Sequence, residues 1–168
     1  MTVSMYQISI PVFVQMLGNL KKILKLAEKH AAAKKIDPGV FLNARLAPDM
    51  HPLTRQIQIA SDTVKGCAAR LSGRAVPSFK DNEKSFADLY RRIDKTLAFV
   101  KKVKAKDIDG TEDKVIELKF PQGSMKFKGK PYLLHFVLPN LYFHVTTAYA
   151  ILRHNGVNVG KRDFIGKV

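Results

Sequence analysis

Apolar residues recur every three or four positions along several stretches of the chain, which is the spacing of one buried helix face. The first helix is expected to open at Ser4, because Ser4 and Gln7 have the spacing of a capping box. Pro11 then marks either a kink or a second start capped by Ser9, and Asp37-Pro38-Gly39 ends the pattern. The stripe after Pro11 consists of Phe13, Met16, Leu17, Leu20, Ile23, Leu24 and Ala27.

Two further stripes predict a second and a third helix, after a short helical turn within 40–46. The second helix is expected to begin at Asp49 as N-cap and to end at Gly73. The third is expected from about Asp81 to Val103. Their apolar positions are Leu53, Ile57, Ala60, Val64 and Leu71, followed by Phe86, Leu89, Ile93, Leu97, Val100 and Val103.

The pattern changes near residue 115. Residues 115–120 and 125–128 alternate apolar and polar positions around a turn, which predicts a small β-hairpin. A fourth helix, 132–154, is apolar nearly all the way round, as in a helix buried centrally or in a dimer interface. The sequence therefore predicts an all-α fold of four helices with a hairpin between helices three and four.

Composition supports one compact unit, predicted as a single domain over residues 1–168. Apolar residues make up 46% of the chain, enough for a sizeable core. The single cysteine, Cys67, excludes an internal disulfide framework. We find neither the features of a secretory signal nor an apolar run that could span a bilayer, so we expect a cytoplasmic protein without membrane contact.

The charge is unusual, with 29 Lys and Arg against 14 Asp and Glu and a net charge of +15. Such a balance favours nucleic acids, acidic membranes or acidic proteins as partners. Nucleic-acid readers usually add aromatic residues to their basic surface, whereas the aromatic residues here occupy core positions. Nucleic-acid binding is therefore one hypothesis among several.

Candidate chemistry is sparse. None of the five histidines has a second histidine at i+4, where two side chains share a helix face and can hold a metal ion. His144 lies in the apolar fourth helix, with Ala148 at i+4. Arg55, Gln58 and Asp62 form a polar strip on the second helix, and this strip faces either an internal pocket or solvent.

Four runs of sequence carry a resemblance to a known family: Ser4–Tyr6, Asn43–Met50, Pro52–Gln58 and Asn140–Gly156. Together they resemble a bacterial family of unknown function within the DinB/YfiT-like superfamily, whose members are classed as metalloenzymes. The resemblance covers essentially the whole chain. It implies a DinB/YfiT-like four-helix bundle with a long connection before the last helix, often assembled as a homodimer.

The resemblance also implies a site. Superfamily members typically hold a divalent metal with one histidine on the second helix and two at i and i+4 on the last. His144 matches the first histidine of the last-helix pair and Ala148 the second, while the second-helix histidine would fall near Gln58 or Ile59. A single imidazole cannot hold zinc. His51 or Asp62 would replace a ligand only if the fold brings it to His144.

Three hypotheses follow, and none fixes whether the protein is an enzyme. The first is a member without the metal that binds a small molecule or partner in the former site. The second is a divalent-metal enzyme, with zinc or nickel held by His144 and non-standard ligands, of the thiol-transferase kind seen in the superfamily. The third is a basic nucleic-acid-binding module. The pocket candidates are His144, Gln58, Asp62, Arg55 and Tyr149.

Overall fold

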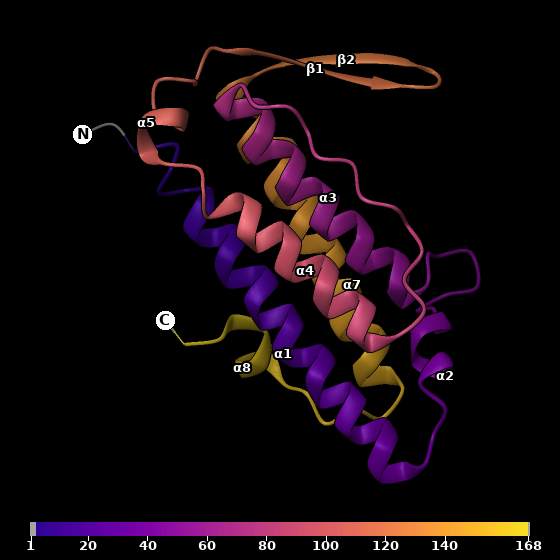
Figure 1. The fold of residues 1–168 in the computed structure, drawn as a ribbon. Helices are drawn as coiled ribbons and strands as arrows, with labels where there is room; N and C mark the ends of the chain where they lie inside the picture. The colour runs from indigo at the N-terminus through magenta and orange to yellow at the C-terminus, as the bar shows by residue number, and fades with distance from the viewer. Residues whose placement is uncertain (1–2, 168) are drawn as a thin grey trace.

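The structure, a computed structural model, describes residues 3–167 and is mostly helical with one small antiparallel sheet, as the hydrophobic pattern predicts (Figure 1). Residues 1, 2 and 168 of the predicted domain lie outside the described residues. In chain order the elements are α1 Ile10–Lys34, α2 Pro38–Asn43, α3 Leu53–Ser72, α4 Phe86–Val100, α5 Ala105–Ile108, β1 Val115–Phe120, β2 Gly123–Lys128, α6 Gly129–Pro131, η1 Tyr132–Val137, α7 Leu138–His154 and α8 Lys161–Ile165.

The long helices α1, α3, α4 and α7 run side by side, and the hairpin lies across one end of them (Figure 1). α3 packs against both α4 and α7, and α1 packs against α4 and α7. Their apolar stripes meet in one continuous core, and removal of this surface from water is the main force that holds the helices together. Within residues 3–167, no helix is both long enough and apolar enough to cross a membrane.

The first helix starts later than its capping-box spacing predicts. Residues 5–9 form a turn, and α1 begins at Ile10 with Ser9 as N-cap and Pro11 in the first turn. Proline suits this position because the first N–H groups of a helix have no partner within it. The Ser9 hydroxyl donates to the carbonyl of Met5 at 2.6 Å instead of capping the helix.

The second and third helices also begin later than predicted. Asp49 is not an N-cap, because α3 begins at Leu53, directly after Pro52. Proline disfavours helical geometry in the residue before it, here His51, and so delays the start. α4 begins at Phe86 with the Ser85 hydroxyl accepting from the N–H of Asp88, not at Asp81. α3 ends at Gly73 as expected, in the left-handed conformation with φ +71°.

The fourth long helix is not α-helical throughout. A single helix is predicted over 132–154, but its first residues, Tyr132–Val137, form η1, a turn of π-helix between α6 and α7. The N–H of Leu138 bonds to the carbonyl of Leu133, five residues back. Pro139 is the second residue after this turn, and it has no N–H to donate an α-helical hydrogen bond. The π-helical turn thus ends where proline interrupts the hydrogen bonding.

The hairpin is confirmed, with β1 and β2 paired from Val115 opposite Lys128 to Phe120 opposite Gly123. The C-terminal segment, expected as a short basic tail, contains α8, which packs against α1. The side-chain amide of Asn19 on α1 donates to the carbonyls of Phe164 and Ile165 at 3.0 and 2.9 Å. This contact fixes the end of the described chain.

Candidate functional site

His144 lies at the contact between α7 and α3, where the resemblance places a former metal site. Its Nδ1 is 2.7 Å from Oε1 of Gln56, whose Nε2 donates to the backbone carbonyl of His51 at 2.9 Å. Because the Gln56 amide nitrogen is committed to that carbonyl, its oxygen is an acceptor and His144 carries its proton on Nδ1. The side chain opposite His144 is therefore Gln56, rather than Gln58 or Ile59.

The environment keeps His144 neutral. Burial, together with the nearby charges of His51 and Arg55, lowers the pKa of its imidazole to about 4. Only 8% of the residue is exposed, and the Phe143 ring lies edge-on to it, with ring centroids 5.2 Å apart. His51 thus lies near His144 despite its place before the helix, but the polar link between them runs through Gln56.

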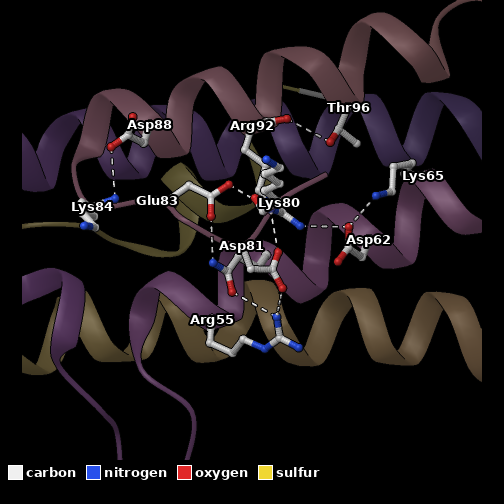
Figure 2. A network of polar contacts seen from close by, with 11 residues as sticks. Arg55, Asp62, Lys65, Lys80, Asp81, Glu83, Lys84, Asp88, Arg92 and Thr96 are labelled. Carbon is white, nitrogen blue, oxygen red and sulfur yellow. Dashed lines mark hydrogen bonds and ion pairs between the residues drawn. The ribbon is translucent and has the colours of Figure 1, made fainter. Parts of the chain in front are cut away.

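A second polar centre surrounds Arg92, whose side chain on α4 is buried (Figure 2). Its Nη1 lies 2.9 Å from carboxylate oxygens of both Asp81 and Glu83, and its Nη2 lies 3.0 Å from Asp62. Burial alone would lower the pKa of Arg92, but its hydrogen bond to Glu83 and the charges of the three carboxylates outweigh this effect and raise the pKa. The guanidinium therefore stays charged and anchors the segment between α3 and α4.

The predicted polar strip on α3 belongs to this network. Arg55 donates to Gln58 at 3.1 Å and pairs with Asp81 at 2.5 Å, and the amide of Gln58 donates to Glu83 at 2.8 Å. Asp62 also pairs with buried Lys65 at 2.8 Å. Figure 2 shows Arg55 turned toward Asp81, and Asp62 turned toward Arg92 and Lys65. The strip therefore contributes to this network, while the side chains of Arg55 and Asp62 remain 40% and 41% exposed.

Beside the strip lies a hollow of about 260 Å³ between α3, the hairpin, η1 and α7. Arg55, Asp62 and Thr63 line it from α3, and Asn140 lines it from α7, one turn before His144. Its apolar lining comes from Ile59, Leu118, Phe120, Phe136 and Val137. The hollow thus combines hydrogen-bonding groups with apolar surface, which is typical of small-molecule sites.

Three more polar residues, Arg70, Lys119 and Tyr132, complete the hollow at the hairpin end. Arg70 on α3 donates from Nη1 to the hydroxyl of Tyr132 at 3.3 Å, and both side chains line the hollow. Tyr132 is 2% exposed and packs with Phe127 and Phe136. A second hollow of about 350 Å³ lies on the other side of Arg92, between segment 78–83 and α4.

Tyr149, the remaining predicted pocket residue, lies apart from the others. Its ring packs edge-on against Phe164 of α8 at 6.2 Å, and its hydroxyl lies 3.5 Å from the carbonyl of Val159. The structure therefore brings Arg55, Gln58 and Asp62 into one network, places His144 in a neighbouring contact between α3 and α7, and leaves Tyr149 against α8.

The described residues do not fit the three-histidine metal centre that the resemblance implies. Across residues 3–167, no three His, Cys, Asp or Glu side chains lie close enough together to hold a metal ion. His144 offers only Nε2, since Nδ1 is bonded to Gln56. Cys67 is buried within α3, and burial strongly raises the pKa of its thiol, so it is not a thiolate ligand at neutral pH.

Comparison with known proteins finds a family model and a solved structure that match this chain. Residues 5–165 match the model of a family described as a domain of unknown function, DUF1993. The chain belongs to the DUF1993 family. The chain is also similar to a DinB family member protein from Shewanella denitrificans whose crystal structure is known. The two sequences are 40% identical, the match covers 97% of this chain and 92% of the other, and the structures superpose with a TM-score of 0.89. No curated protein matches.

The match makes this DUF1993 chain a member of a DinB-like family of unknown function. Sequence reasoning missed four of its site residues: Gln56, Arg70, Arg92 and Tyr132. Gln56 had a usable signal, because it stands three residues after Leu53 on the buried stripe of α3. The others have partners 30 or more positions away, or on another element, and no local pattern reveals such pairs.

Proposed function

We propose that this DUF1993 protein is a DinB/YfiT-like four-helix bundle that binds a small molecule beside the former metal site. The hollow between α3, the hairpin, η1 and α7 carries this proposal. It offers hydrogen-bonding groups and aromatic surface from segments far apart in the sequence. Its residue Asn140 lies one helical turn from His144.

The contact at His144 supports binding without metal chemistry. Gln56 occupies the side of α3 from which a metal ligand would face His144, and its amide already bonds to the imidazole. A glutamine amide is a weak zinc ligand beside histidine, cysteine or a carboxylate. The metal-dependent alternative, with zinc or nickel on His144, would therefore need ligands from outside this contact.

A screen of small fragments by protein-observed NMR tests the proposal. Fragments that bind should shift backbone signals of α3 and η1 around the hollow. Thr63→Trp would fill the hollow and should abolish those shifts. Ala33→Trp is the control, because it adds a tryptophan at an exposed position of α1 that does not line the hollow. If no fragment shifts the signals around the hollow, or if Thr63→Trp leaves the shifts intact, the proposal is wrong.

We also propose that the protein is a homodimer that uses the outer face of α7. Tyr142 and Phe143 stand next to each other on this helix and are 40% and 56% exposed. Adjacent exposed aromatic side chains are costly in water and are enriched in protein interfaces. A dimer through this face would cover both.

A further inference from the structure

The positive charges around the hollow are not all compensated. Arg55 is paired with Asp81, and the carboxylate of Asp62 is shared by Arg92 and Lys65. Among residues 3–167, by contrast, neither Arg70 nor Lys119 has a carboxylate within ion-pair distance. The hairpin end of the hollow is therefore electropositive.

The Arg70 guanidinium has a fixed place. It folds back over Gly66, one turn earlier on α3, and a methyl group at position 66 would collide with its Nη1. Glycine within a helix costs about 1 kcal/mol relative to alanine. The missing side chain at position 66 leaves room for the guanidinium, which bonds from there to Tyr132.

Tyr132 adds a hydrogen-bond donor at the same point. Burial raises the pKa of its hydroxyl to about 12, so the group stays protonated at neutral pH. The hydroxyl oxygen accepts from Arg70, but among the described residues no acceptor receives the hydroxyl hydrogen. Arg70 and Tyr132 thus present donors, and no acceptor charge, to the same end of the hollow.

The rest of the hollow suits an apolar group. Ile59, Phe136 and Val137 contribute apolar side chains to its lining. The volume of about 260 Å³ is at the small end for a ligand site. A ligand that fills this volume can carry one charged group and a compact apolar body.

We propose that the hollow binds a small organic carboxylate. The carboxylate bonds to the Arg70 guanidinium and the Tyr132 hydroxyl, and the apolar body of the ligand packs against Ile59, Phe136 and Val137. Arginine favours this group because its parallel N–H donors match the two carboxylate oxygens. Lys119 is exposed, so Arg70 is the cation that a contact within the hollow holds in place, and one fixed cation with a neutral hydroxyl suits a monoanion better than a phosphate dianion. This inference rests on the proposed small-molecule site.

Four simple probes separate the features of the ligand, and NMR titration of the full chain measures their affinities. Benzoate has both the charge and the apolar body, benzamide is its neutral counterpart, acetate lacks the body, and phenyl phosphate carries the other oxyanion. We expect benzoate to bind at the hollow at least about tenfold more tightly than benzamide or acetate. Tighter binding of phenyl phosphate than of benzoate would overturn the assignment to a carboxylate.

Two variants test the role of Arg70. Arg70→Gln should weaken benzoate at least about tenfold while leaving benzamide unchanged. Gly66→Ala keeps the charge and favours the helix but displaces the guanidinium, so it should weaken benzoate with no loss of thermal stability. Arg74→Gln is the matched control, because Arg74 pairs with Asp107 outside the hollow. Unchanged benzoate affinity in both Arg70→Gln and Gly66→Ala would overturn the proposal.

The results also separate this inference from the proposed function. If neutral fragments bind at the hollow and benzoate does not, or if benzamide equals benzoate, the carboxylate site is wrong and the small-molecule site stands. If neither the probes nor any fragment of the wider screen binds there, both are wrong.

Discussion

His144 on α7 and Gln56 on α3 form a hydrogen bond of 2.7 Å across 88 positions of the chain. Both residues are buried, and Gln56 extends the link to the backbone at His51. A buried donor that loses its acceptor costs about 1–3 kcal/mol. The pair therefore specifies how α3 and α7 meet.

Replacing Gln56 with methionine should lower the free energy of unfolding by about 1–3 kcal/mol, because the imidazole N–H and the His51 carbonyl lose their partner while the volume is kept. Urea denaturation measures the change. Gln122→Met, in the exposed hairpin turn, is the control. The double variant Gln56→Met with His144→Leu should lose less than the sum of the single changes. Strict additivity would mean that the two residues do not interact.

Acid should weaken the fold through His144. Burial lowers its pKa to about 4, whereas the unfolded chain has a value near 6.5, so the unfolded state binds more protons between these values. The free energy of unfolding should therefore fall as pH decreases from about 6.5 to 4, by up to roughly 3 kcal/mol from this group. Above about pH 6.5, His144 should contribute no dependence of stability on pH. Urea titrations from pH 4 to 7.5 measure the slope.

His144→Gln should remove that part of the pH dependence. His154→Gln is the control, because His154 is exposed at the end of the same helix. An equal pH slope in the wild type and His144→Gln would show that His144 titrates normally.

Removing Arg92 should destabilise the protein by about 3 kcal/mol, because Asp62, Asp81 and Glu83 would lose their common cation. Arg92→Met tests this by denaturation, and hydrogen exchange over residues 77–84 should rise as the segment loses its anchor. Arg91→Met, on the exposed side of α4, should change stability by less than about 0.5 kcal/mol. Equal effects of the two substitutions would be inconsistent with an anchoring role for Arg92.

Elemental analysis after dialysis against zinc, nickel and manganese in turn tests the metal alternative. We expect no tightly held stoichiometric ion, because His144 is not grouped with two further His, Cys, Asp or Glu side chains among residues 3–167. About one retained ion per chain, lost in His144→Ala and kept in His154→Ala, would instead support a metalloenzyme with unusual ligands.

Light scattering at micromolar concentration should give the mass of a dimer. Phe143→Glu should convert it to a monomer, because a charge would be buried in the interface. Val40→Glu, an equally exposed apolar position on α2, should leave the dimer intact. A monomeric wild type would rule out the dimer.

The sequence predicts the helices of this fold better than it predicts their beginnings. The stripes from Phe13 and from Leu53 identify α1 and α3, because burial repeats with the helical period. Asp81 resembles a helix start by residue type, yet its carboxylate pairs with Arg92 and stays outside α4. Local capping rules cannot detect an ion pair with a residue farther along the chain that keeps a side chain from capping a helix.

The candidate site shows the same limit. Residues spaced along one helix, such as Arg55 and Asp62, are recognisable as a strip, and the structure does join them in one network. Arg55 pairs with Asp81 in the segment before α4, and Asp62 pairs with Arg92 on α4. Arg70 likewise meets Tyr132 across 62 positions. Tyr149 follows His144 by five residues and so points toward another side of α7.

The π-helical turn Tyr132–Val137 changes the direction in which the side chains before α7 point, relative to those of α7 itself. A π-helical turn takes in one residue more than an α-helical turn, which offsets the preceding residues by about 100° around the axis. Tyr132 and Phe136 can thereby line the hollow while Leu141 and Val145 stay in the core. A relative with an uninterrupted α-helix here should align with this chain only across a single-residue gap, and it should lack this wall of the hollow.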